Sequence, residues 1–112
     1  MAENYNQVSL DSFLEGFDVL EEDLLIGDHI PFGEENAISR EQLRIRCGME
    51  DRMMRRAIEH DRKIIPIVNT QNGKGYFRPL PEDSGALNAF IKQNVSRALS
   101  ILQWVKVAKQ GV

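Results

Sequence analysis

Apolar residues recur at steps of three and four near the start of the chain, which is the period of a helix with one buried face. Acidic residues fill the positions between them, Gly16 interrupts the pattern, and Gly27 and Pro31 end it. The spacing predicts an acidic amphipathic helix over residues 10–25. Its apolar positions are Leu10, Phe13, Leu14, Phe17, Leu20, Leu24 and Leu25.

A second apolar pattern with the same period occupies the end of the chain. It follows Pro79 and Pro81 and predicts one long helix over about residues 82–109. Its apolar positions are Leu87, Ile91, Val95, Ala98, Leu102 and Val105, widened by Phe90, Leu99, Ile101 and Trp104. This face could cover the core of its own domain, or it could form a dimer interface through Leu99, Leu102, Trp104 and Val105.

Between these patterns the sequence predicts two short helices joined by a turn. Ser39 is a good helix N-cap, with Gln42 completing a capping box, and Gly48 can adopt the left-handed conformation that ends a helix. The first helix should cover residues 40–46 and the second about residues 50–60. Their expected buried positions are Leu43, Cys47, Met54, Ala57 and Ile58. Two helices in this order form a helix-turn-helix unit, whose second helix enters the DNA major groove.

A hairpin is predicted after the second helix. Residues 64–68 form a β-branched run whose Pro66 favours an edge position, and a second strand begins at Gly75. Residues 69–74 form the polar loop between them, and residues 36–38 could add a short third strand. The resulting fold class is α+β, a winged helix-turn-helix domain over residues 30–80. An acidic extension (1–29) precedes it, and the C-terminal helix (81–112) follows.

Three groups of residues carry a resemblance to a known family. The run 33–48, the paired arginines of the second helix and the run 72–77 are similar to small winged-helix proteins of phages and prophages of Gram-positive bacteria. The similarity covers roughly residues 30–110 and does not include the acidic residues 1–29. It implies DNA binding in phage replication or gene control.

Charge is divided unevenly along the chain. Residues 1–35 contain ten acidic residues and no Lys or Arg, whereas residues 36–112 contain seven acidic residues and all fourteen Lys and Arg. The basic part can attract a polyanion such as double-stranded DNA. The residues expected to contact DNA are Arg52, Arg55 and Arg56 on the second helix, Arg40 and Arg44 on the first, and Lys74 in the wing. A solvated cationic surface is the alternative interpretation.

The acidic extension has three possible roles. It could pack its apolar side on the domain, compete with DNA for the basic surface, or bind another protein. In that last case the protein would be an interaction adaptor that uses the extension and the apolar C-terminal helix, with the winged fold as a scaffold. A homodimer is expected if the C-terminal helix self-associates.

Other chemistry finds little support in the sequence. Cys47, His29 and His60 do not form a metal-ligand spacing, and Lys74 between two glycines lacks the spacing of a phosphate-binding loop. We therefore expect neither an enzyme nor a bound cofactor. A single cysteine, no N-terminal signal pattern and no long apolar run are typical of a cytoplasmic protein that does not bind membranes.

Overall fold

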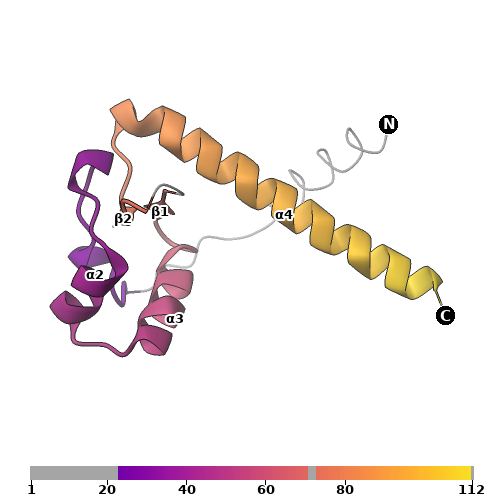
Figure 1. Cartoon of the computed structure of the whole chain (residues 1–112), viewed down its shortest axis with the longest axis horizontal. Helices are drawn as coiled ribbons and strands as arrows, with labels where there is room; N and C mark the ends of the chain where they lie inside the picture. Colours follow the sequence, from indigo (N-terminus) through magenta and orange to yellow (C-terminus); the bar gives the residue numbers. More distant parts are fainter. Residues whose placement is uncertain (1–22, 71–72, 112) are drawn as a thin grey trace.

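A computed structural model of the chain describes residues 23–70 and 73–111. In this part the fold is α+β, with helices α2 (Arg40–Cys47), α3 (Asp51–Asp61) and α4 (Ser84–Gln110). Strands β1 (Val68–Asn69) and β2 (Tyr76–Phe77) form a small antiparallel sheet between α3 and α4. Figure 1 shows α2, α3 and the sheet grouped together, with α4 running past them toward the C-terminus.

The turn between α2 and α3 has the predicted local structure. The N–H of Gln42 donates to Ser39 Oγ at 3.1 Å, and the N–H of Ser39 donates to Gln42 Oε1 at 3.2 Å, so the capping box is confirmed. Gly48 ends α2 in the left-handed conformation, with φ 68° and ψ 26°. These contacts satisfy backbone groups at both ends of α2 and direct the chain into α3.

The core confirms the predicted buried positions Leu43, Met54, Ala57 and Ile58, whereas Cys47 is half-buried against it. Ile26 and Ile30, on either side of the predicted boundary at residue 29, also lie in this core. Among the described residues, the buried hydrophobic residues are Ile26, Ile30, Ile38, Leu43, Met54, Ala57, Ile58, Ile67, Val68 and Phe77, and all but the last two form one contact cluster. Residues 26–30 therefore help to build the domain.

The end of the predicted N-terminal helix has a different structure. Residues 1–22 lie outside the described part, but Leu24 and Leu25 are not helical, and a 3-10 turn follows at Gly27–His29. The N–H groups of Leu25, Ile26 and Gly27 all donate to the carboxylate of Asp61. They therefore cannot bond to carbonyls one helical turn earlier, so the helix prediction is wrong for this stretch.

The hairpin is shorter than its sequence pattern predicts. Val68 pairs with Phe77 and Asn69 with Tyr76, whereas residues 62–65 form a turn because the N–H groups of Ile64 and Ile65 donate to the carbonyl of Asp61. The expected third strand is reduced to one bridge, in which Ile38 and Tyr76 exchange hydrogen bonds of 2.9 and 2.8 Å. Asn36 belongs instead to a 3-10 turn, Glu34–Asn36.

Gly75 is required where β2 meets Ile38. Its φ is +108°, and a Cβ at this position would lie 2.1 Å from the carbonyl oxygen of Ile38. We expect Gly75→Ala to lower the free energy of unfolding by about 2 to 3 kcal/mol, measured by urea denaturation. Gly73→Ala is the control, because Gly73 has a similar φ of +80° but open space around it. Equal losses in both variants would contradict a role for this close contact.

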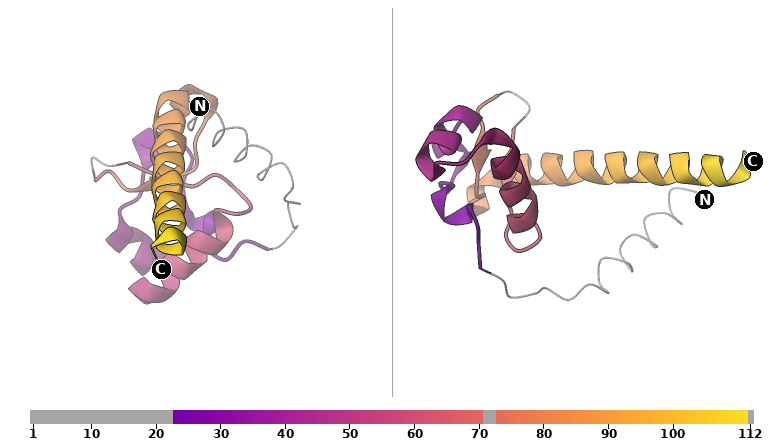
Figure 2. Two further views of the ribbon diagram at one scale, coloured as in Figure 1. Left: turned by 90° about the vertical axis from the view of Figure 1, so that its right-hand side faces the viewer. Right: turned by 90° about the horizontal axis from the view of Figure 1, so that it is seen from below.

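Helix α4 extends well beyond the rest of the fold. A 3-10 turn, Pro81–Asp83, leads into it, and Asp83 Oδ2 accepts the N–H of Leu80 at 2.8 Å and of Glu34 at 3.3 Å. No residue of α4 is buried, and residues 100–111 are all exposed. The radius of gyration, 16.3 Å, exceeds the value of about 13 Å expected for a compact chain of 100 residues. Figure 2 shows the C-terminal half of α4 projecting away from α2 and α3.

Candidate nucleic-acid interface

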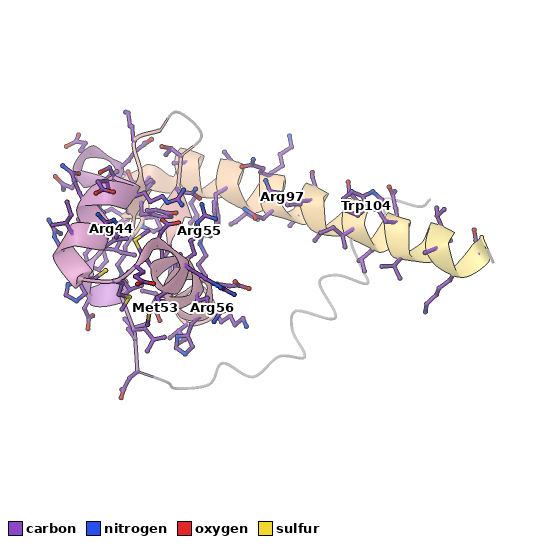
Figure 3. All side chains as sticks on the ribbon, turned by 60° about the horizontal axis from the view of Figure 1, so that its bottom comes forward. Arg44, Met53, Arg55, Arg56, Arg97 and Trp104 are labelled. Carbon is purple, nitrogen blue, oxygen red and sulfur yellow. The ribbon has the colours of Figure 1, made fainter. Side chains whose placement is uncertain are left out.

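The outward side of α3 carries three exposed arginines, Arg52, Arg55 and Arg56. Met54, Ala57 and Ile58 bury the opposite side of the same helix in the core. Arg52 and Arg56 are four residues apart, so their side chains share one face of the helix. Figure 3 shows Arg55 and Arg56 on α3 and Arg44 on the neighbouring α2.

Asp51, in the first turn of α3, pairs with Arg40 on α2 and with Arg55 on its own helix. Arg40 Nε donates to Asp51 Oδ1 at 2.5 Å, Arg40 Nη2 donates to Asp51 Oδ2, and Arg55 Nε lies 3.3 Å from Asp51 Oδ2. The hydrogen bonds from Arg40 hold the pKa of Asp51 below its ordinary value. Asp51 therefore stays ionised and offsets part of the positive charge at this junction.

Arg44 has its own acidic partner within α2. Its Nη2 and Nε donate to the two carboxylate oxygens of Glu41 at 2.7 and 3.2 Å. These hydrogen bonds lower the pKa of Glu41, and the charge of Asp51 also acts on Arg44. The structure thus brings three predicted contact residues, Arg40, Arg44 and Arg55, together around Asp51.

Arg52 and Arg56 differ from these three. Both are exposed, and within the part of the chain that the structure describes neither forms an ion pair. Lys74 is also exposed, in the segment between β1 and β2. The full charge of Arg52 and Arg56 is therefore available at the surface of α3.

Two apolar side chains accompany this cationic surface. Ile45 on α2 is 67% exposed and Met53 on α3 is 59% exposed. Each therefore presents an exposed apolar side chain on one of the two helices that carry the arginines. Their sequence spacing gave no reason to single out either residue as part of a site.

Arg62, directly after α3, was not predicted to have a role. Its Nε donates to the carbonyl of Ile67 at 3.1 Å and its Nη2 to Asn69 Oδ1 at 3.0 Å. Its guanidinium carbon lies 5.1 Å from the centroid of the Phe90 ring on α4 and 6.0 Å from that of Tyr76. Arg62 therefore connects the end of α3 to the hairpin and to α4.

The predicted dimer residues lie on the projecting part of α4. Leu102 is 56% exposed, Trp104 68% and Val105 47%, whereas Leu99 is half-buried. Ile101 and Val107 on the same part of α4 are also exposed. The projecting half of α4 therefore presents a large apolar surface with nothing covering it in the described structure.

Residues 23–70 and 73–111 contain no cluster of three metal-ligating side chains. No described helix has both the length and the apolar character that crossing a bilayer requires. Comparisons with protein-family models, with curated proteins and with solved structures found no match to this chain.

Proposed function

We propose that this protein binds double-stranded DNA as a winged helix-turn-helix, with α3 as the recognition helix and the β1–β2 hairpin as the wing. The observation that carries the proposal is the exposed pair Arg52 and Arg56, which lies opposite the buried side of α3 and has no ion pair in the described residues. Guanidinium groups at this position of a second helix suit guanine edges and phosphates.

The remaining arginines would support this contact in a different way. Arg40, Arg44 and Arg55 are held in place by Asp51 and Glu41. On binding, a phosphate group can replace a carboxylate group as the acceptor, because both groups offer two oxygens to the parallel N–H bonds of a guanidinium. Lys74 would contact the backbone beside the major groove. The role served, gene control or replication of a phage or prophage, is supported only by the family resemblance.

The salt dependence of binding tests this proposal. If three or four cationic side chains neutralise phosphates, the logarithm of the affinity should fall with the logarithm of salt concentration at a slope of about −3 to −4. The measurement is a fluorescence titration of labelled duplex DNA at several NaCl concentrations. Binding that is absent at low salt, or a slope near zero, would contradict DNA recognition through this surface.

A protein-interaction adaptor is the second candidate function. It is favoured by the exposed side chains of Ile45, Met53 and Trp104, since apolar and aromatic residues are enriched in the centre of protein interfaces. Replacing Ile45 and Met53 by serine separates the two functions. If the Ile45→Ser/Met53→Ser variant binds DNA as tightly as the unmodified protein but no longer binds a protein partner, the adaptor function is favoured.

A further inference from the structure

One face of α4 lies toward its own domain along the first half of the helix, where Phe90 and Gln93 are half-buried. Phe90 and Gln93 line a pocket of about 360 Å³ together with Asn69 and Thr70, and Arg97 lines a neighbouring pocket together with Arg62. Phe90, Gln93 and Arg97 therefore lie on the side of α4 that faces the domain.

The same face continues past the edge of the domain and becomes apolar. Ile101, Trp104 and Ala108 follow Arg97 at steps of four, three and four residues, so they share its side of the helix. Ile101 is 44% exposed and Trp104 68% exposed, and Figure 3 shows Trp104 farther along α4 than Arg97. We call Arg97, Ile101, Trp104 and Ala108 the distal face.

The charge of α4 indicates what kind of segment could cover this face. Residues 84–111 contain Lys92, Arg97, Lys106 and Lys109 and no acidic residue. Two copies of α4 brought together would repel each other through four positive charges each. An apolar partner with negative charge is favoured instead.

The chain itself contains a segment with these properties. Residues 1–22, which lie outside the described part, include six acidic residues and no Lys or Arg. Their apolar residues Leu10, Phe13, Leu14, Phe17 and Leu20 have helical spacing. The segment is therefore complementary to the distal face in both charge and apolar character.

The structure also fixes the point from which this segment starts. Leu25, Ile26 and Gly27 are tied to Asp61 at the end of α3, and the next residue, Arg62, reaches the Phe90 ring on α4. Eleven residue steps of helix span about 17 Å, so a helix over residues 11–22 would be as long as the α4 stretch from residue 97 to 108. The chain therefore leaves the domain at the end of α3, next to the residue whose side chain contacts α4, and the segment is long enough to follow the distal face.

We propose that the apolar side of residues 10–22 docks on the distal face of α4 in the same chain. Docking would bury Trp104 and place carboxylates near Arg97 and Lys109. The tether raises the local concentration of the segment, so a weak contact suffices. This inference does not depend on DNA binding.

Trp104 is the single tryptophan of the chain and reports on this contact directly. In the full-length protein we expect acrylamide to quench its fluorescence several-fold less than in the variant Phe13→Glu/Phe17→Glu. The matched control is Asn4→Glu/Asn6→Glu, which adds the same charge without removing apolar side chains. Arg97→Glu changes the other side of the contact and should also increase quenching. Circular dichroism verifies that each variant remains folded.

The result must not depend on protein concentration, because the contact lies within one chain. Sedimentation of the full-length protein as a monomer, with Trp104 protected, supports the proposal. Equal quenching in the full-length protein and in Phe13→Glu/Phe17→Glu overturns it. If Trp104 is protected from acrylamide only at concentrations where the protein dimerises, the proposal is also overturned, since a second copy would then cover the distal face.

Discussion

Replacing Asp61 by alanine is expected to lower the free energy of unfolding by about 3 to 5 kcal/mol. The carboxylate of Asp61 is fully buried and accepts the N–H groups of Leu25, Ile26 and Gly27 at 3.0, 2.8 and 2.6 Å. Alanine would leave these donors without an acceptor, and each buried N–H without a partner costs about 1 to 3 kcal/mol. It would also release Ile26 from the core. Urea denaturation measures the change.

Asp28→Ala is the matched control for this loss. Asp28 lies in the same segment and carries the same charge, but its side chain is exposed. A small effect, within about 0.5 kcal/mol, is expected for such a surface position. If both variants lost the same stability, the hydrogen bonds to Asp61 would not be what holds residues 25–27.

The same carboxylate makes stability depend on pH. Burial alone would raise the pKa of Asp61, but hydrogen bonds from Leu25, His60, Ile26 and Gly27 outweigh burial and hold the pKa below 3.8. A lowered folded-state pKa means that the unfolded chain binds the proton first as pH falls. The contribution of Asp61 to the free energy of unfolding is therefore present above pH 3.8, the ordinary pKa of an aspartate. It is lost as the pH falls through the lower pKa that Asp61 has in the folded protein. Asp61→Asn should remove this part of the acid sensitivity.

The parts of the fold that the sequence predicted correctly depend on neighbouring residues. The capping box joins residues three positions apart, and the left-handed turn at Gly48 depends on a single glycine. The buried positions of α3 follow from helical periodicity. Such features need no knowledge of how distant segments pack.

The incorrect helix prediction at Leu24 and Leu25 has a long-range cause. Leu24 and Leu25 continue the helical spacing of the apolar residues before them. The N–H groups of residues 25–27, however, donate to Asp61, which lies 34 to 36 positions away. The second helix was predicted to end at about residue 60, and its pattern did not indicate that Asp61 would be buried. Hydrogen bonds over this separation leave no periodic trace in the sequence.

The candidate interface shows the same division. Residue type and helical spacing were enough to select Arg52, Arg55 and Arg56 as exposed. The sequence did not show which arginines are paired with a carboxylate, because the Arg40–Asp51 contact joins two helices and spans eleven residues. Helical period cannot distinguish Arg55, which shares Asp51, from Arg52, which does not.

This difference sets the last prediction, which concerns DNA affinity. We expect Arg52→Ala/Arg56→Ala to weaken binding by about 2 to 6 kcal/mol, at least thirtyfold, because each arginine to a base edge contributes about 1 to 3 kcal/mol. Both side chains are exposed, so the fold should be unaffected. Titration of fluorescent duplex DNA at fixed salt gives the affinities. The matched control is Lys92→Ala/Lys109→Ala, which removes the same charge from α4.

Asp51→Asn should act in the opposite direction. It removes the carboxylate that Arg40 and Arg55 share, so both guanidinium groups become available to phosphates and DNA affinity should rise severalfold. An equal loss in the Arg52/Arg56 and Lys92/Lys109 double variants would mean that DNA responds to net charge alone. A loss confined to Arg52→Ala/Arg56→Ala, together with a gain in Asp51→Asn, requires a contact at the surface of α3, because only this surface connects the three residues.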